Sequence, residues 1–333
     1  MKAVRLHGVG DLRVEEIVEP GAPGPAEVLV RVEAAGICGS DLHNFRTGQW
    51  ISRLPTVPGH EFCGTVIAAG PEAGLVAGQR VVADSRVACG ACGPCAGGRP
   101  HLCRSIGYVG EVNDGGFASL VRLPGAQVLA LPDARVDPLA AAMAEPLAVA
   151  AHVVNRLAPQ PGQAVAITGA GAIGALAALL LTHRWLGPVF VADRNQQRLT
   201  LVTRVCEAKA AELDDLAGAI GAAPELAIET TGSAAAADRL LAQMAPGGRV
   251  ASVGIFHGRV EMDLNRIVEG EIDWLGCASF RSELHDVLPL LGSLAPQLRA
   301  LAGTPIGLDA VPEAYRALID GRVPTIKTLV TPY

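Results

Sequence analysis

The feature that most restricts what this sequence can fold into is a group of four cysteines in one short segment. Cys89, Cys92, Cys95 and Cys103 follow the spacing C-x2-C-x2-C-x7-C. Four thiolates at such spacing fit a tetrahedral zinc site whose ligands are all protein atoms, and a redox thiol cluster or a set of disulfides is the alternative. Because eight cysteines in 333 residues do not make a disulfide scaffold, we predict a structural zinc ion that stabilises a lobe and takes no part in catalysis.

A second group of metal-binding residue types comes earlier in the sequence. Cys38 is followed by Ser40, Asp41 and His43, and His60-Glu61 comes after a proline-rich loop. A catalytic zinc site needs three protein ligands and one open position, which Cys38, His60 and one carboxylate would supply. An isolated cysteine is more often a small buried apolar residue, so this group gains weight only from the motifs that follow it.

Glu145 is a second candidate for the carboxylate ligand. It stands before Pro146, and proline suits the first turn of a helix. That places Glu145 near the N-cap, where serine, threonine, aspartate and asparagine are preferred. Two interpretations follow from this position: a metal ligand, or a solvated carboxylate that interacts with the helix dipole.

From residue 163 the pattern changes to alternating strands and helices. An apolar strand at 164–168 is followed by the glycine turn Gly169-Ala170-Gly171-Ala172-Ile173-Gly174, and a helix is expected from Ala175 to Trp185. A strand at 189–192 ends at Asp193, roughly 20 residues after the turn. GxGxxG alone is a weak signal, but between a strand and a helix, with this acid, it is typical of dinucleotide binding.

Each residue of this motif has an expected role. Gly169 allows the tight turn, Gly171 the approach of a pyrophosphate, and Gly174 close packing of helix and strand. Asp193 would accept hydrogen bonds from the adenosine ribose and repel a 2′-phosphate, which favours NAD, whereas nearby arginines keep NADP as an alternative. The candidate cofactor-binding residues are Gly169, Gly171, Ile173, Gly174, Asp193, Arg194 and Arg198.

The length and patterning predict an α/β protein with two domains. Short runs that alternate apolar and polar residues predict a strand-rich, barrel-like domain at 1–146, which holds the zinc ligands. A doubly wound domain at 147–283 would bind the dinucleotide, and the tail at 284–333 would return to the first domain. The cleft between the domains is the expected active site.

Composition excludes several kinds of partner. The net charge of -6, with no block of basic residues, argues against nucleic acid or an anionic membrane. The longest apolar run, 172–181, is too short to span a bilayer, and the first residues do not resemble a signal peptide. We therefore predict a cytoplasmic protein that acts on a small molecule.

The Cys38 and His60-Glu61 group, the four-cysteine segment and the strand–GxGxxG–helix unit occur in the order seen in zinc-dependent medium-chain alcohol dehydrogenases. The chain resembles this family over essentially its whole length. The resemblance implies a GroES-like fold for the barrel-like domain and a Rossmann fold for the other. The subgroup it resembles is the sorbitol and polyol dehydrogenase type, which includes threonine and butanediol dehydrogenases. Glu145-Pro146-Leu147 matches the context of that subgroup's third zinc ligand, and in related enzymes the residue matched by Glu61 can exchange with water or with that ligand.

The resemblance also implies roles for the neighbours of the zinc ligands. Asp41 resembles the carboxylate that orients the zinc-bound His60. Ser40 and His43 resemble the hydroxyl and imidazole of the family's proton relay. Asn44 departs from the pattern, because sorbitol dehydrogenases carry an aromatic residue directly after the relay histidine.

The function implied is oxidation of a secondary alcohol to a ketone by an enzyme with NAD and two zinc ions per chain. The catalytic zinc would act as a Lewis acid, and Ser40 and His43 would move the proton. A polyol or sugar alcohol is the expected substrate, and an amino alcohol or diol such as threonine or butanediol is the alternative. The other class of function is a non-catalytic, nucleotide-binding scaffold, which would hold one zinc ion. We also expect a homo-oligomer, either a tetramer or a dimer.

Overall fold

The protein divides into two compact units, which are described separately. The structure, a computed structural model, describes residues 1–184 and 186–333. The first unit comprises Met1–Glu145 and Leu284–Tyr333, and the second comprises Pro146–Glu283. The end of the helix expected at 175–185, Trp185, lies outside the described residues.

The first unit is built mainly of short strands, which confirms the strand-rich fold predicted for it. Its strands are β1 (Lys2–Gly8), β2 (Asp11–Glu16), β3 (Glu27–Gly36), β4 (Glu61–Ala69), β5 (Arg80–Ala83), β6 (Arg86–Val87), β7 (Gly107–Tyr108), β8 (Leu120–Pro124), β9 (Val128–Ala130), β16 (Ile306–Gly307) and β17 (Leu329–Thr331). Its helices are α1 (Gly39–Thr47), α2 (Gly93–Ala96), α3 (Pro138–Ala141), α11 (Leu291–Leu301) and α12 (Val311–Ile319). Two more helices, α4 (Ala144–Leu157) and α10 (Glu283–Val287), begin where the chain passes between the units.

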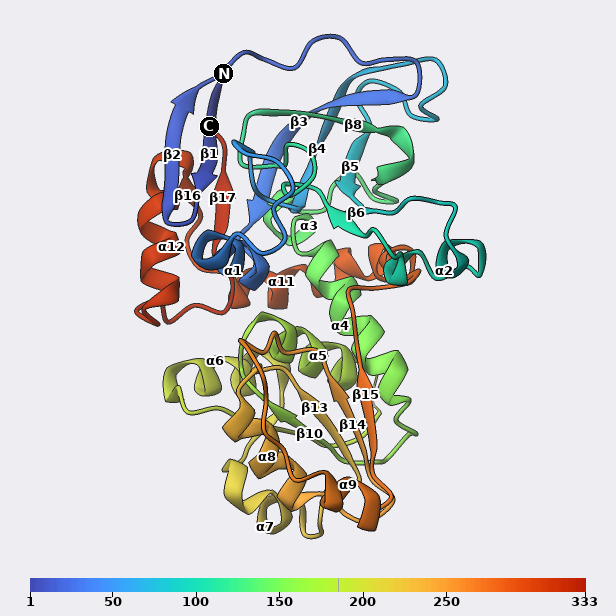
Figure 1. The fold of residues 1–333 in the computed structure, drawn as a ribbon, viewed down its shortest axis with the longest axis vertical. Helices are drawn as coiled ribbons and strands as arrows, with labels where there is room; N and C mark the ends of the chain where they lie inside the picture. Colours follow the sequence, from blue (N-terminus) through green and yellow to red (C-terminus); the bar gives the residue numbers. More distant parts are fainter. Residues whose placement is uncertain (185) are drawn as a thin grey trace. The chain divides into compact units, whose positions relative to one another are not determined.

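One sheet organises the first unit around β3. Its order is β16-β17-β3-β4-β5-β9, and β8 also pairs with β3. β3 is antiparallel to both β4 and β17, so that Gly36 lies opposite Glu61 on one side and opposite Leu329 on the other. The end of β3 therefore brings together segments that are far apart in the sequence. β1 and β2 form a separate hairpin beside α12 (Figure 1).

An aromatic cluster anchors the C-terminal segment to this unit. Tyr315 of α12 is 1% exposed, and the rings of Phe45 and Phe117 meet it edge-on with centroids 5.7 and 6.4 Å away. Edge-to-face contacts of this kind add to the free energy gained by burying the rings. The tail thus contributes to the core of the first unit.

Helix α1 fixes the position of the residues that follow Cys38. Cys38 is its N-cap, and the carboxylate of Asp41 in the first turn accepts a hydrogen bond from the Cys38 amide over 2.8 Å. An acidic group there satisfies an amide at the helix start and interacts favourably with the helix dipole. The helix ends at Gly48, whose φ of 65° is a left-handed conformation that glycine adopts without strain.

The second unit is a parallel sheet with helices on both faces. Its strands are β10 (Val165–Thr168), β11 (Val189–Ala192), β12 (Lys209–Ala210), β13 (Leu226–Glu229), β14 (Arg249–Ser252) and β15 (Asp273–Gly276). The helices that follow α4 are α5 (Ala172–His183), α6 (Gln196–Cys206), α7 (Leu216–Ile220), α8 (Ala234–Gln243) and α9 (Leu264–Glu269). Among the helices of residues 1–184 and 186–333, none combines the length and the apolar composition that a membrane span requires.

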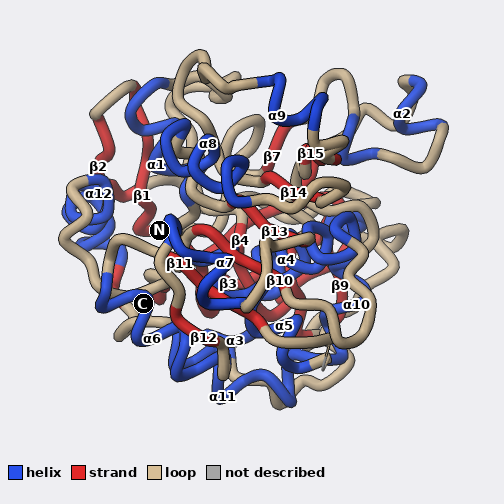
Figure 2. The backbone as a smooth tube through the Cα atoms, turned by 90° about the horizontal axis from the view of Figure 1, so that it is seen from below, coloured by secondary structure: helices blue, strands red, loops and turns tan. Residues whose placement is uncertain are grey.

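The strand order explains how the helices are distributed. The order is β12-β11-β10-β13-β14-β15, and all pairs are parallel. Because crossovers between parallel strands are right-handed, α5 and α6, which lead outwards from β10, lie on one face, and α8 and α9, which lead outwards from β13, lie on the other. Figure 2 shows α5 and α8 on opposite sides of β10 and β13. This arrangement confirms the doubly wound fold.

The turn between β10 and α5 depends on its glycines. Gly169 has a φ of 104°, in the left-handed region that favours glycine. A Cβ atom on Gly174 would lie 1.9 Å from the carbonyl oxygen of Gly169, which is a backbone atom of the turn itself. Gly171 is different, because no described atom beyond its two chain neighbours lies within 4 Å of the place its Cβ would take.

Gly174→Ala is expected to lower the free energy of unfolding by about 2 kcal/mol, because backbone atoms must shift to admit the methyl group. Denaturant unfolding of the variant measures this change. Gly171→Ala is the matched control and should leave stability nearly unchanged. Equal stability of the two variants would contradict the packing role of Gly174.

Candidate functional site

The four cysteines predicted to bind a structural zinc lie together around α2. The Sγ atoms of Cys89, Cys92, Cys95 and Cys103 are all within 4.8 Å of one another. Cys92 Sγ is 3.4 Å from that of Cys95 and 3.9 Å from that of Cys103. Zinc–sulfur bonds of about 2.3 Å place the sulfurs of a tetrahedral site roughly 3.8 Å apart. The group therefore has the donors and the spacing for a zinc ion.

The thiols of this group differ in their readiness to ionise. The Cys89 amide donates a hydrogen bond to Cys103 Sγ over 3.3 Å, and this contact lowers the pKa of the Cys103 thiol to about 6. Burial and the neighbouring thiols instead raise the pKa of Cys95 to about 12. Four thiolates at this separation repel one another, so a bound cation is needed for all of them to be ionised together.

Three donors of the second predicted site also come together. The ligand atoms of Cys38, His60 and Glu61 lie within 4.8 Å of one another. Adjacent residues in a strand point to opposite faces, but His60 lies before β4, after a turn at Gly59 with a φ of 97°. The side chains of His60 and Glu61 therefore converge on Cys38, although they are neighbours in the sequence.

Glu61 forms a buried ion pair with Lys327. Lys327 Nζ contacts Glu61 Oε2, and the two residues are 3% and 1% exposed. Gly36 provides the room, since a Cβ atom there would lie 2.2 Å from Glu61 Oε2 and 2.9 Å from Lys327 Cε. Glu61 Oε1 is buried and has no hydrogen-bond partner among the described residues. A buried oxygen of this kind suits a metal ligand, because an unpaired buried polar atom is otherwise costly.

Glu145 lies close to this group but outside it. It is the second residue of α4, and its carboxylate accepts a hydrogen bond of 2.6 Å from the hydroxyl of Ser85, a fully buried residue. Burial raises the pKa of Glu145 to about 7, an effect that His60 opposes and Glu61 strengthens. The structure thus places Glu61, rather than Glu145, with Cys38 and His60, and keeps Glu145 near enough to interact electrostatically with them.

The residues that resemble the orienting acid and the proton relay lie along α1. Asp41 Oδ1 is 3.6 Å from His60 Nδ1; burial acts to lower the pKa of His60, but Asp41 and Cys38 raise it well above its usual value. Ser40 Oγ is 3.5 Å from His60 Nε2. His43, one turn further on, is buried, and its Nε2 atom is 2.9 Å from Gln49 Oε1.

A further carboxylate, which sequence analysis did not single out, lies near these groups. Glu111 is 5% exposed and accepts a hydrogen bond of 2.8 Å from Asn44 Nδ2. Its own amide donates to the carbonyl of Tyr108 over 3.0 Å, and the Tyr108 ring is 6.4 Å from that of His60. Burial raises the pKa of Glu111 to about 7, against the influence of His60.

In the second unit, the predicted dinucleotide-binding residues gather at the carboxyl ends of β10 and β11. Asp193 follows β11, and its carboxylate accepts hydrogen bonds of 2.6 Å from the Ala170 amide and 2.7 Å from the Asn195 amide. Each carboxylate oxygen can accept a further hydrogen bond. β10 and β13 are the neighbours from which the connections lead to opposite faces of the sheet, and ligands of doubly wound sheets bind at such a point.

The other predicted dinucleotide-binding side chains lie in or just before the first turns of α5 and α6. Ile173 lies partly buried in the first turn of α5. Arg194 is exposed, and Arg198 lies in the first turn of α6, where its amide is capped by Asn195.

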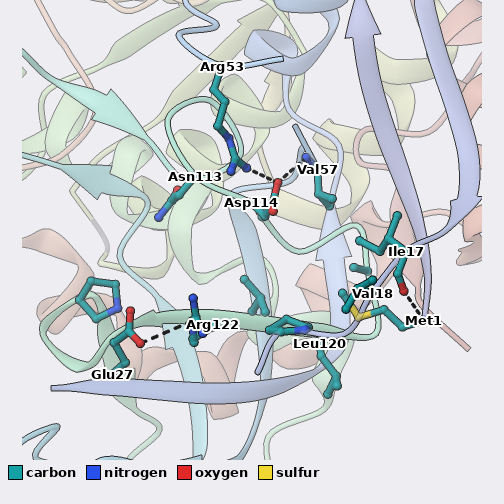
Figure 3. Close-up of a pocket in the computed structure, with 15 residues that line it drawn as sticks. Met1, Ile17, Val18, Glu27, Arg53, Val57, Asn113, Asp114, Leu120 and Arg122 are labelled. Atoms are coloured by element: carbon teal, nitrogen blue, oxygen red, sulfur yellow. Dashed lines mark hydrogen bonds and ion pairs between the residues drawn. The ribbon is translucent and has the colours of Figure 1, made fainter. Parts of the chain in front are cut away.

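A cavity of about 420 Å³ lies elsewhere in the first unit (Figure 3). Its charged residues face one another: Arg53 contacts Asp114, and Arg122 lies 3.4 Å from Glu27. None of the residues that line it belongs to the predicted zinc or dinucleotide sites. The predicted zinc-binding and dinucleotide-binding residues therefore lie outside this cavity.

Comparison with known proteins assigns the chain to a family. Residues 24–133 match the family Alcohol dehydrogenase GroES-like domain, and residues 172–293 match the family Zinc-binding dehydrogenase. L-threonine 3-dehydrogenase of Streptomyces avermitilis is 35% identical over 279 residues, which cover 78% of this chain and 81% of the relative. The chain belongs to the zinc-dependent medium-chain alcohol dehydrogenase family.

Solved structures of similar proteins agree with this assignment. A zinc-binding dehydrogenase from Sinorhizobium meliloti, bound to NADP, superposes on this medium-chain dehydrogenase with a TM-score of 0.89 at 32% identity, covering 99% of each chain. A short-chain alcohol dehydrogenase from Escherichia coli, solved with NADH, gives a TM-score of 0.89 at 27% identity, covering 100% of this chain and 99% of that one. Proteins of this fold are thus seen with either dinucleotide.

Some residues that lie around the predicted zinc ligands escaped sequence analysis. Lys327 gave a local signal, since it is a charged residue within the otherwise mostly apolar run 326–330. Ser85 and Glu111 gave none, because only the tertiary fold of this medium-chain dehydrogenase brings their loops to the first turns of α1 and α4.

Lys327→Met should lower the free energy of unfolding by about 3 kcal/mol, because it leaves the buried Glu61 carboxylate without its counter-ion. Denaturant unfolding measures the loss. The double variant Glu61→Gln/Lys327→Met, which removes both charges, should recover most of it. Lys2→Met, which breaks the exposed pair with Asp309, is the matched control and should have no measurable effect; the same small effect at Lys327 would show that the buried pair does not stabilise the fold.

Proposed function

We propose that this chain is an NAD-dependent dehydrogenase that oxidises a secondary alcohol to a ketone. The observation that carries the proposal is the convergence of Cys38, His60 and Glu61, which leaves room for a metal with an open position. The glycine turn with Asp193 supports a dinucleotide as the other reactant. The overall reaction converts the alcohol and NAD⁺ into the ketone, NADH and one proton.

We assign the catalytic zinc at rest to Cys38, His60 and Glu61. Glu145, whose carboxylate accepts a hydrogen bond from Ser85, lies outside this resting set and would join the ligands only during turnover. Zinc bound there supplies a Lewis acid that polarises the oxygen of the substrate. Asp41 fixes the orientation of the His60 ring through the Nδ1 atom of that histidine, as partners of metal-bound histidines do. The second zinc ion belongs to Cys89, Cys92, Cys95 and Cys103, where it holds the loop around α2.

The proton of the substrate hydroxyl leaves through Ser40 and His43. Ser40 lies in the first turn of α1 beside His60, and His43 lies one turn further along the same helix. His43 Nε2 meets the exposed side chain of Gln49, so the outer end of this path reaches solvent. A hydroxyl followed by an imidazole provides groups that can accept and pass on a proton in sequence.

NAD is the proposed cofactor because of Asp193. Its carboxylate is held at the end of β11 by two backbone amides, and a fixed negative charge there repels a 2′-phosphate. Gly171 would keep the turn open to the pyrophosphate, since no described atom beyond its chain neighbours lies within 4 Å of the place its Cβ would take. Ile173, Arg194 and Arg198 complete the proposed cofactor-binding residues.

Two substrate classes are candidates. A polyol or sugar alcohol is the class implied by the resemblance to sorbitol dehydrogenases. An amino alcohol is favoured by the similarity to L-threonine 3-dehydrogenase and by an acidic side chain, Glu111, near the metal centre. Both classes share the secondary hydroxyl on which the proposed reaction depends.

A panel of secondary alcohols tests the proposed function. Sorbitol, 2,3-butanediol, L-threonine and 1-amino-2-propanol are each incubated with NAD or NADP, and the absorbance of the reduced cofactor is followed. At least one should be oxidised, with a higher kcat/KM for NAD than for NADP. No reduced cofactor with any alcohol, in protein that holds two zinc ions per chain, would reject a dehydrogenase of this substrate class.

Zinc analysis of carboxylate variants tests the ligand assignment. Glu61→Gln/Lys327→Met should retain about one zinc ion per chain, because only the four-cysteine site stays complete. Glu145→Gln should retain about two and lose activity. The four-cysteine zinc serves as an internal control for folding. Two zinc ions in the double variant and one in Glu145→Gln would assign the third ligand to Glu145, as the resemblance alone implies.

A further inference from the structure

Glu111 is a buried carboxylate, and the side chain that donates a hydrogen bond to it is neutral. Glu111 is 5% exposed, and its Oε1 atom accepts a hydrogen bond from the Asn44 amide group. Asn44 is itself 3% exposed and is fixed in turn, because its Oδ1 atom accepts a hydrogen bond from the Trp50 amide over 3.1 Å. The acid is therefore held in one place by a rigid neighbour.

The turn that carries Glu111 is attached to the metal centre on three sides. Tyr108, which begins the turn, has its ring beside that of His60. The amide of Val109 donates to the carbonyl of Ser85 over 2.8 Å, and Ser85 is the residue that binds Glu145. Asn44 links the acid to α1 directly after His43. Glu111 thus belongs to the surroundings of the proposed reaction.

Three of the other buried carboxylates show what Glu111 lacks. Glu61 faces Lys327, Asp41 faces His60, and Glu283 lies 2.9 Å from His152. Glu145 and Glu229 also have no ion pair among the described residues, but Glu145 lies beside the proposed zinc ligands, and Glu229 accepts several hydrogen bonds from neutral donors. In residues 1–184 and 186–333, no ion pair involves Glu111. A buried carboxylate without a counter-ion is costly, and burial accordingly raises the pKa of Glu111 to about 7. A cationic group brought by a ligand would remove this cost, whereas a neutral hydroxyl would remove little of it.

We propose that Glu111, positioned by Asn44, binds the ammonium group of an amino-alcohol substrate and so determines specificity for amines. The inference rests on the proposed function and narrows it, since it selects the amino alcohol over the polyol. It also gives Asn44 a physical role at the position where sorbitol dehydrogenases carry an aromatic residue. An amide can hold a carboxylate in a fixed orientation by donating a hydrogen bond to it, as Asn44 does, whereas an aromatic ring cannot.

The test compares 1-amino-2-propanol with 1,2-propanediol, which differ by an ammonium group in place of a hydroxyl. The wild-type enzyme should have the higher kcat/KM for the amine. Glu111→Gln should lower kcat/KM for the amine roughly 30-fold or more, because one partner of a buried charged contact is lost, and should change that for the diol little. Glu27→Gln, which alters a carboxylate paired with Arg122 away from the metal centre, should change neither value.

The outcomes separate this inference from the proposed function. Equal losses for amine and diol in Glu111→Gln, or a wild-type enzyme that oxidises the diol and not the amine, would overturn the role of Glu111 while the dehydrogenase function stands. Failure to oxidise any alcohol of the panel would instead reject the function. If Glu111→Gln does not fold, inhibition of the wild-type enzyme by propylamine decides the matter: competition with the alcohol substrate supports the inference, and no inhibition overturns it.

Discussion

The ion pair between Glu61 and Lys327 is the interaction on which the arrangement of the proposed metal centre depends. Both groups are nearly inaccessible to water, so each charge is tolerable only in the presence of the other. The pair sits where β3 meets β4 on one side and β17 on the other, beside a glycine that leaves space for it. One electrostatic contact thus connects the proposed ligand Glu61 to a segment that comes much later in the sequence.

The carboxylates around this pair differ mainly in the partner that each one meets. Glu61 meets an ammonium group, Asp41 an imidazole and a backbone amide, Glu145 a hydroxyl, and Glu111 a side-chain amide. Acids of the same type acquire different properties when their surroundings differ. In this centre the partners distinguish the acid that suits a metal ligand, the acid that orients a ligand, and the acids that keep a proton more readily at neutral pH.

The parts of the molecule that the sequence predicts well are those whose geometry is local. The four cysteines converge because they share one short loop, and the glycine turn follows directly from the strand before it. The choice between Glu61 and Glu145 is not local, because it depends on the turn at Gly59 and on where β4 begins. The expectation that adjacent side chains diverge applies within strands, and His60 lies just outside one. Lys327 enters the centre through the pairing of β17 with β3, which no short pattern specifies.

The position of Lys327 in the chain also affects the order in which the protein can be made. Translation supplies Cys38, His60 and Glu61 first, then the whole of the second unit, and only afterwards the lysine that neutralises Glu61. The second unit is continuous in sequence and can fold as it emerges from the ribosome. The first unit cannot bury Glu61 together with its counter-ion until residues 284–333 have been made, so its folding is completed after the second unit has been synthesised.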